Sequence, residues 1–191
     1  MRKELHKSAN VTPLPVLMIA TYNDDGTANV MNAAWGTQYS VDTVMINLSN
    51  HRTTENLKKR EAFTLSYATK KTVVESDYFG IVSGAKENKL QKAKFHAIKS
   101  EHVDAPLIEE YPLTLECKVD KLVQDGPDSY ILYGKVLAVS ADESILTKGK
   151  VDIGKLEPIA FCPFDGTYRV VRDVAGAAFR CGLAIKRKKA E

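Results

Sequence analysis

The stretch that decides the fold is Val16-Leu17-Met18-Ile19-Ala20-Thr21-Tyr22-Asn23-Asp24-Asp25-Gly26-Thr27-Ala28-Asn29-Val30. Its first half is a short apolar run that is rich in strand-forming residues. The segment Asn23-Asp24-Asp25-Gly26 is a strong turn signal, and a second extended segment follows it. The stretch therefore predicts a β-hairpin near the N-terminus.

Outward from this hairpin, strand signals outnumber helix signals. Apolar or alternating runs predict strands at residues 43–48, 62–67, 113–123 and 130–139. The turn at 125–128 joins the last two as a hairpin, and a final stretch holds the segments 158–161 and 168–171. A short helix is expected at 55–60, capped by Thr53 or Thr54, and residues 72–97 look helical. This order predicts a mainly β chain, an antiparallel barrel or sandwich with peripheral helices at its edges.

Length and composition suit one domain over residues 1–191, with 1–10 and 183–191 as peripheral tails. The net charge is +3 and much of the excess lies in Lys186-Arg187-Lys188-Lys189, which is interpreted as a solvated terminus rather than a nucleic-acid arm. The chain has no apolar run long enough to span a membrane and no secretory signal pattern, so a cytoplasmic location is expected, with no membrane or nucleic-acid partner.

Several common sites are not indicated by the sequence. The three cysteines are widely spaced, so neither a zinc site nor a disulfide framework is predicted, although Cys162 stays open as a redox thiol. The four histidines have no partners at metal-ligand spacing, so no metal is expected. The glycine-rich signatures of the Rossmann and P-loop nucleotide sites are missing. No residue stands out as a catalytic acid, base or nucleophile.

Three segments carry groups that could hold an anionic, flat ligand. The polar loop from Ser49 to Thr54 lies between a strand and a helix start, which is where a phosphate finds amide donors and a favourable dipole; a polar loop with a capping threonine is the alternative. The segment from Asn29 to Gly36 contains the small residues Ala33 and Ala34 beside the single tryptophan, Trp35, which could wall a pocket or anchor the core. The segment from Ser83 to Lys89 could add a tight turn at Gly84 and a second cation from Lys86 or Lys89, and solvated lysines are the alternative.

Taken in order, these segments resemble the flavin reductase-like family, which includes the flavoredoxins. The similarity runs from about Pro13 to Val171, and it is carried by Pro13-Leu14-Pro15-Val16, Asn32-Ala33-Ala34-Trp35, Ser49, Arg52, Thr54, Phe63, Ser83-Gly84, Lys89, Ala105-Pro106-Leu107-Ile108, Leu115-Glu116-Cys117-Lys118, Tyr133-Gly134-Lys135-Val136 and Gly166-Thr167-Tyr168-Arg169.

The resemblance implies an antiparallel, Greek-key-like FMN-binding split barrel that forms a homodimer, with each flavin near the subunit interface. It implies FMN contacts from Met31, Asn32, Ala33, Ala34, Trp35, Ser49, Asn50, His51, Arg52, Thr54, Ser83, Gly84, Lys89 and Tyr168. Of these, Ser49, Arg52 and Thr54 would hold the phosphate with help from Lys89, and Tyr168 would approach the ring.

The resemblance also implies a flavoprotein oxidoreductase. It would move electrons from NAD(P)H or a protein donor to flavin, ferric complexes or a redox partner. Two alternatives stay open on the same fold. One is a non-enzymatic module that binds FMN or haem, and the other is an oxidase of the pyridoxamine-phosphate type.

Overall fold

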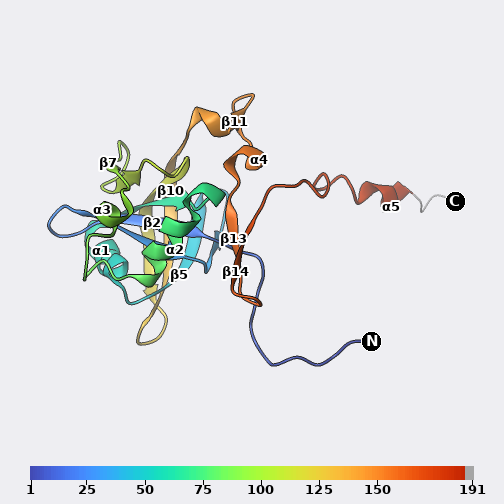
Figure 1. Ribbon diagram of the computed structural model, residues 1–191, viewed down its shortest axis with the longest axis horizontal. Helices are drawn as coiled ribbons and strands as arrows, with labels where there is room; N and C mark the ends of the chain where they lie inside the picture. The colour runs from blue at the N-terminus through green and yellow to red at the C-terminus, as the bar shows by residue number, and fades with distance from the viewer. Residues whose placement is uncertain (188–191) are drawn as a thin grey trace.

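A computed structural model describes residues 1–187 of the chain, which form a β-rich body with two protruding ends (Figure 1). Within these residues the main sheet is antiparallel, with the strand order β3-β2-β6-β9-β10-β5-β4. Its strands are β2 (Leu17–Tyr22), β3 (Ala28–Ala33), β4 (Gly36–Gln38), β5 (Thr43–Ser49), β6 (Ala62–Tyr67), β9 (Leu113–Gln124) and β10 (Ser129–Ala141). The sheet curls into a half-barrel, the split-barrel arrangement.

Smaller elements surround this sheet. A second antiparallel sheet contains β1 (Leu14–Pro15), β13 (Ile159–Cys162) and β14 (Thr167–Val170). Two-stranded pairs are β7 (Ala97–Lys99) with β8 (Pro106–Ile108), and β11 (Leu146–Thr147) with β12 (Lys150–Val151). The helices are α1 (Arg52–Arg60), α2 (Val73–Ile81), α3 (Lys89–Ala93), α4 (Ile153–Leu156) and α5 (Leu183–Arg187), with 3-10 turns η1 (Lys70–Thr72) and η2 (Glu143–Ile145).

Strand β2 is apolar on both sides because it separates two hydrophobic clusters. Leu17 and Ile19 belong to the cluster inside the half-barrel. Met18 points to the other face, into a second cluster that includes Phe79 of α2. Successive strand residues point to opposite faces, so an uninterrupted apolar run is what a strand covered on both sides requires.

The strand predictions are confirmed, and two helix predictions need correction. The first helix begins at Arg52 rather than at 55, and His51 is its N-cap instead of a threonine; the His51 side chain makes no capping hydrogen bond. The helical stretch expected over 72–97 is interrupted. Helix α2 ends where Val82 takes extended backbone angles, α3 starts only at Lys89, and the stretch ends in β7. The intervening loop includes Gly84, where a Cβ atom would lie 2.1 Å from Oδ1 of Asn29, so the backbone passes closer to β3 than a regular helix could.

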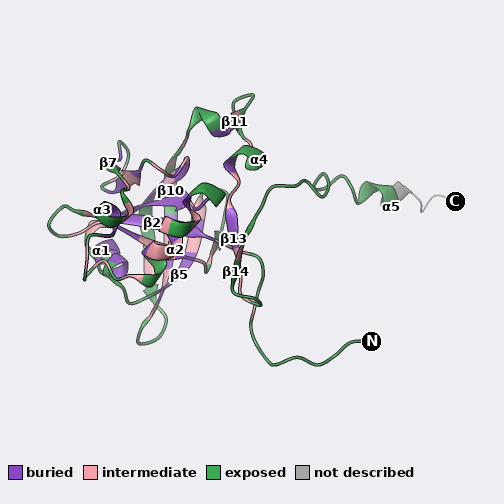
Figure 2. Ribbon diagram, in the orientation of Figure 1, coloured by how far each residue is buried: buried purple, intermediate pink, exposed green. Residues whose placement is uncertain are grey.

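The two ends of the chain leave the body beside β13 and β14 and extend into solvent (Figure 1; exposed residues are green in Figure 2). Residues 183–187 of the expected C-terminal tail form α5, whereas Lys188 and Lys189 of the basic run lie outside the described residues. Among residues 1–187 there is no helix with the length and apolar character that crossing a bilayer demands.

Candidate functional site

A hollow of about 580 Å³ opens between β3, the start of α1 and the segment that joins α2 to α3. Its lining is Asn29, Met31, Asn32, Asn50, His51, Arg52, Thr53, Glu55, Phe79, Gly80, Ile81, Val82, Ser83, Gly84, Ala85 and Lys89. This volume is in the range of sites that bind small molecules and cofactors. Three segments that are distant in sequence therefore converge on one cavity.

The N-terminus of α1 supplies donors to this hollow. Within the described part of the chain, the backbone N–H groups of Arg52, Thr53 and Thr54 have no acceptor, and the first helical hydrogen bond is from Glu55 to the carbonyl of His51 at 3.1 Å. Unpaired N–H groups and the helix dipole together favour an anion at this end. The exposed Arg52 guanidinium lies at the same end and has no ion-pair partner among residues 1–187. The carboxylate of Glu55 also lines the hollow, but it is paired with Lys58 at 2.8 Å.

Lys89 supplies a second positive charge from the opposite wall. Its side chain is 5% exposed, and its Nζ donates a hydrogen bond to the carbonyl oxygen of Phe79 at 3.0 Å. No carboxylate among residues 1–187 pairs with it. Burial lowers the pKa of this ammonium group to about 8. A buried cation without a counter-charge, aimed into a polar hollow, fits an anionic ligand.

Buried polar side chains hold the walls of the hollow in place. Asn29 of β3 donates to the Thr53 hydroxyl at 2.9 Å, which ties the strand to the first turn of α1. One turn later, Asn56 donates to the Thr21 hydroxyl at 3.0 Å. Gly84 lies against Asn29 so closely that any side chain there would displace it. The cradle is therefore shaped by contacts within the protein itself.

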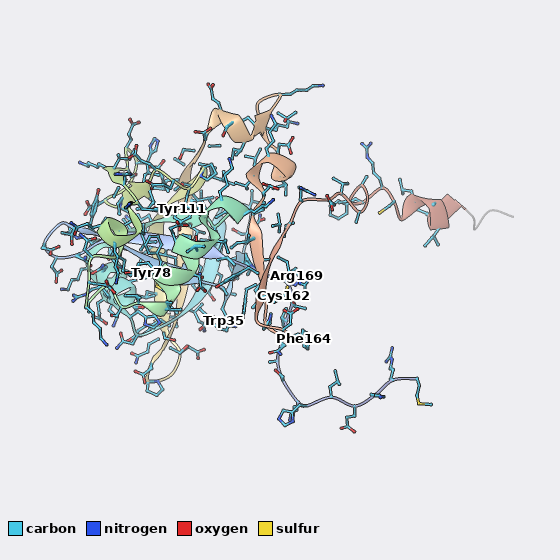
Figure 3. All side chains as sticks on the ribbon, viewed as in Figure 1. Trp35, Tyr78, Tyr111, Cys162, Phe164 and Arg169 are labelled. Carbon is cyan, nitrogen blue, oxygen red and sulfur yellow. The ribbon has the colours of Figure 1, made fainter. Side chains whose placement is uncertain are left out.

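A smaller hollow of about 230 Å³ adjoins the first one, and the two share Asn32, Gly80 and Ile81 in their linings. Its other walls are Val16, Ala34, Trp35, Asp77, Phe161 and Tyr168. The Tyr168 hydroxyl donates to Asp77 at 2.7 Å, and burial together with this carboxylate raises the pKa of Tyr168 to about 12. Trp35 is 67% exposed and lies on the side of the molecule that carries the β13–β14 hairpin (Figure 3). This annex is mostly apolar with one hydrogen-bonded polar corner.

The structure brings most of the sequence-predicted site residues together. The larger hollow is lined by eight of them, namely Met31, Asn32, Asn50, His51, Arg52, Ser83, Gly84 and Lys89. The annex adds Ala34, Trp35 and Tyr168. Three residues line neither hollow: Ala33 is buried in the barrel core, Ser49 is exposed, and the buried Thr54 donates its hydroxyl proton to the Ser49 carbonyl at 2.7 Å.

Sequence reasoning placed Asn29 and Thr53 in the candidate segments without giving either a contact to the ligand, and it missed Asp77. The signal for Thr53 was available, because any first-turn residue of the helix after the polar loop presents its N–H to the same space. Asn29 and Asp77 reach the site only through tertiary packing.

The cysteines and acidic groups form no further centre in the described part of the chain. Cys117 is fully buried, which raises its pKa to about 12, and Cys162 is half-buried in β13. No three His, Cys, Asp or Glu side chains within residues 1–187 converge as they would around a metal ion.

Comparison with known proteins places this geometry in a family. The chain is similar to two solved flavoredoxins. For that of Desulfovibrio vulgaris (Miyazaki F), the TM-score is 0.90 at 31% identity, covering 95% of this chain and 100% of the other. For that of Methanosarcina acetivorans, the TM-score is 0.86 at 29% identity, covering 96% and 100%. An FMN-binding protein of Thermus thermophilus, solved with bound 1-cyclohex-2-enone, shares the fold with a TM-score of 0.76 at 20% identity, covering 93% and 99%.

A sequence model of the flavin reductase like domain matches residues 9–160, which is most of the chain. The protein therefore belongs to the flavin reductase-like domain family.

Proposed function

We propose that the protein holds one FMN in the larger hollow and acts as a flavoprotein oxidoreductase. The observation that carries the proposal is the buried ammonium group of Lys89, which has no carboxylate partner among residues 1–187 and shares the lining of the hollow with the start of α1, where the first N–H groups are open. Family membership and the likeness to two flavoredoxins support a flavin as the ligand.

The residues present fit the phosphate end of such a cofactor. A phosphate dianion would neutralise Lys89 and receive hydrogen bonds from the N–H groups at residues 52–54. Arg52 would supply a forked guanidinium, which suits a phosphate better than a single donor does. Glycine at position 84 lets this wall of the hollow pack against β3, because a Cβ there would collide with Asn29. Thr54 would contribute through its backbone, since its hydroxyl donates to the carbonyl of Ser49. The Thr53 hydroxyl accepts a hydrogen bond from Asn29 and keeps its own proton to donate.

The ring end would lie against Met31 and Asn32, toward the annex with Ala34 and Tyr168. Asn32 is held there by its own hydrogen bond to the Ser76 carbonyl at 3.0 Å. When bound, the flavin supplies hydride or single-electron chemistry, and the protein supplies binding, orientation and electrostatics. The donor in this proposal is NAD(P)H or a protein, and the acceptor is free flavin, a ferric complex or a redox partner.

The same proposal includes a homodimer. Trp35 and Phe164, 67% and 65% exposed, lie near the annex on the side of the β13–β14 hairpin (Figure 3). Exposed aromatic side chains gathered on one side of a protein mark interaction surfaces. A second copy packed on this side would bring each flavin near the interface.

The test is a titration of the flavin-free protein with FMN, followed by NADH or NADPH under anaerobic conditions. Saturable quenching of FMN fluorescence and loss of the flavin absorbance after NAD(P)H are the expected results. Binding without loss of absorbance would leave a flavin module that needs a protein donor or has no turnover. Oxygen consumption only with a pyridoxamine-type substrate would favour the oxidase. Absence of FMN binding at micromolar protein would refute the proposal.

A further inference from the structure

After Arg172, the described residues of the chain make no hydrogen bond or ion pair with the body. We call residues 173–187 the C-terminal arm. Val171 still bonds to the Pro158 carbonyl at 2.8 Å and Arg172 still pairs with Glu157 at 3.5 Å. Beyond Arg172, every hydrogen bond of the described residues joins arm residues to one another or to Arg172 itself. Figure 1 shows the arm running away from the sheets.

The arm carries apolar side chains that water does not stabilise. Phe179 is 100% exposed and Val174 is 89% exposed, and Ile185 in α5 is 75% exposed. Burying one such side chain is worth about 1.5–3 kcal/mol. Figure 2 shows the arm coloured as exposed up to its grey end, so docking these side chains on an apolar surface would lower the free energy.

The body contains an apolar hollow that could receive the arm. We call it the barrel cup. It has a volume of about 470 Å³ and is lined by Pro15, Leu17, Gly36, Thr37, Gln38, Ser40, Val41, Asp42, Thr43, Val44, Leu65, Tyr67, Leu115, Val136 and Val139. Leu17, Leu65 and Leu115 put the hollow at the open side of the half-barrel. Val41 at its edge is 97% exposed.

We propose that the C-terminal arm of one protomer lies in the barrel cup of a second copy, and that the exchange is mutual. Each protomer would contribute the fifteen residues of its arm and the fifteen that line its cup to the interface. This number reaches the roughly 20–30 residues that each partner contributes to a stable interface. Each copy has one arm and one cup, so two copies satisfy each other and the assembly closes with twofold symmetry. This inference rests on the homodimer proposed above but not on FMN binding.

The placement is tested by photo-crosslinking in the full-length protein. Phe179 is replaced with p-benzoylphenylalanine, and chains grown in ¹⁴N and ¹⁵N media are mixed, allowed to exchange and irradiated. The expected product is a covalent dimer in which residue 179 of one isotope is joined to a peptide from residues 36–44 or 136–139 of the other. A crosslinked dimer that joins residue 179 elsewhere, for example to Trp35 or to an N-terminal segment, would refute the arm placement and leave the dimer standing. Crosslinks within one chain only, or a sedimentation pattern of monomers, would refute both.

A pair of substitutions measures how much the docked arm contributes to the free energy of dimerisation. Phe179→Asp should raise the dimer dissociation constant at least about 100-fold, because both arms of each dimer change. Ile98→Asp is the control, since Ile98 is an exposed apolar residue too, at 48%, but lies on β7, on the far side of the body from the arm (Figure 1). Equal dissociation constants for the two variants, each folded by circular dichroism, would overturn the proposal. FMN titration of the same samples shows separately whether the cofactor proposal holds.

Discussion

Replacing Lys89 with Met separates a ligand-binding lysine from a structural one. The substitution keeps an unbranched side chain of similar length but removes the buried ammonium group. A hydrogen bond to a charged group is worth about 1.5–3 kcal/mol, so the FMN dissociation constant at neutral pH should rise about 10- to 150-fold. The stability of the flavin-free protein should change much less, because the buried charge destabilises the folded state as long as no anion is bound.

The size of this destabilisation follows from the pKa of Lys89. Lowering the pKa of Lys89 from the ordinary lysine value of 10.5 to about 8 corresponds to roughly 3 kcal/mol of penalty on the charged form. Losing the donor to the Phe79 carbonyl costs about 1–3 kcal/mol in the other direction. The two effects offset, and the unfolding free energy of flavin-free Lys89→Met at pH 7 should lie within about 2 kcal/mol of the parent value, measured by urea denaturation.

The pH dependence has a definite sign. Below pH 8 the Lys89 ammonium is charged and attracts phosphate, so FMN affinity in the parent protein should fall as the pH rises through about 8, and the Lys89→Met variant should lack this decline. Between pH 8 and 10.5 the unfolded chain binds more protons than the folded one, so the flavin-free parent should gain stability relative to the variant over that window.

The control is Lys92→Met on the same helix, where the side chain is exposed and paired with Glu87 at 2.8 Å. The reasoning would be refuted if Lys89→Met kept the parent's FMN affinity and pH profile while losing several kcal/mol of stability.

Other substitutions test the remaining walls of the site and the core. Arg52→Ala should weaken FMN binding by about 1–3 kcal/mol in a fluorescence titration, whereas Arg60→Ala, at the other end of α1 and paired with Asp104, should have little effect. Gly84→Ala should cost about 1–3 kcal/mol of stability through overpacking and also weaken FMN binding, because the new Cβ displaces Asn29; Gly182→Ala, which meets no atom within 4 Å, should change neither. Phe63→Ala should lower the unfolding free energy by about 3–5 kcal/mol, since Phe63 is fully buried in the barrel cluster; a loss below 1 kcal/mol would contradict the packing described. Cys117 should stay unreactive toward a thiol reagent at pH 8 until the protein unfolds, given its burial and raised pKa.

The sequence predicts the strands well because their signals are local. The run from Val16 to Tyr22 is apolar at every position that faces either cluster, and the turn before Gly26 supplies the left-handed backbone angle of the hairpin. The helical region from residue 72 is harder to predict from the sequence, because a tertiary contact determines where it is interrupted. The loop that contains Gly84 packs against Asn29 of β3, and no local sequence pattern predicts that contact.

The residues of the candidate site also fall into those that local signals predict and those that only tertiary packing places. Arg52 and its neighbours could be predicted, because a helix N-terminus after a polar loop is a local signal. The burial of Lys89 could not be predicted, since one of several lysines in a polar stretch is expected to be solvated until α2 and α3 are packed together. The same limit explains Thr54, whose hydroxyl turns back to the Ser49 carbonyl instead of toward the ligand.

The hydrogen bonds from Asn29 to Thr53 and from Asn56 to Thr21 have a consequence for how the protein handles its cofactor. Both join segments of the protein without any ligand atom, so the cradle has its shape before FMN enters. Binding to a cradle that the protein's own contacts hold in shape costs little chain entropy. A flavin held in this way can dissociate and be replaced while the protein stays folded. Such binding suits a protein that exchanges whole flavin molecules as well as electrons.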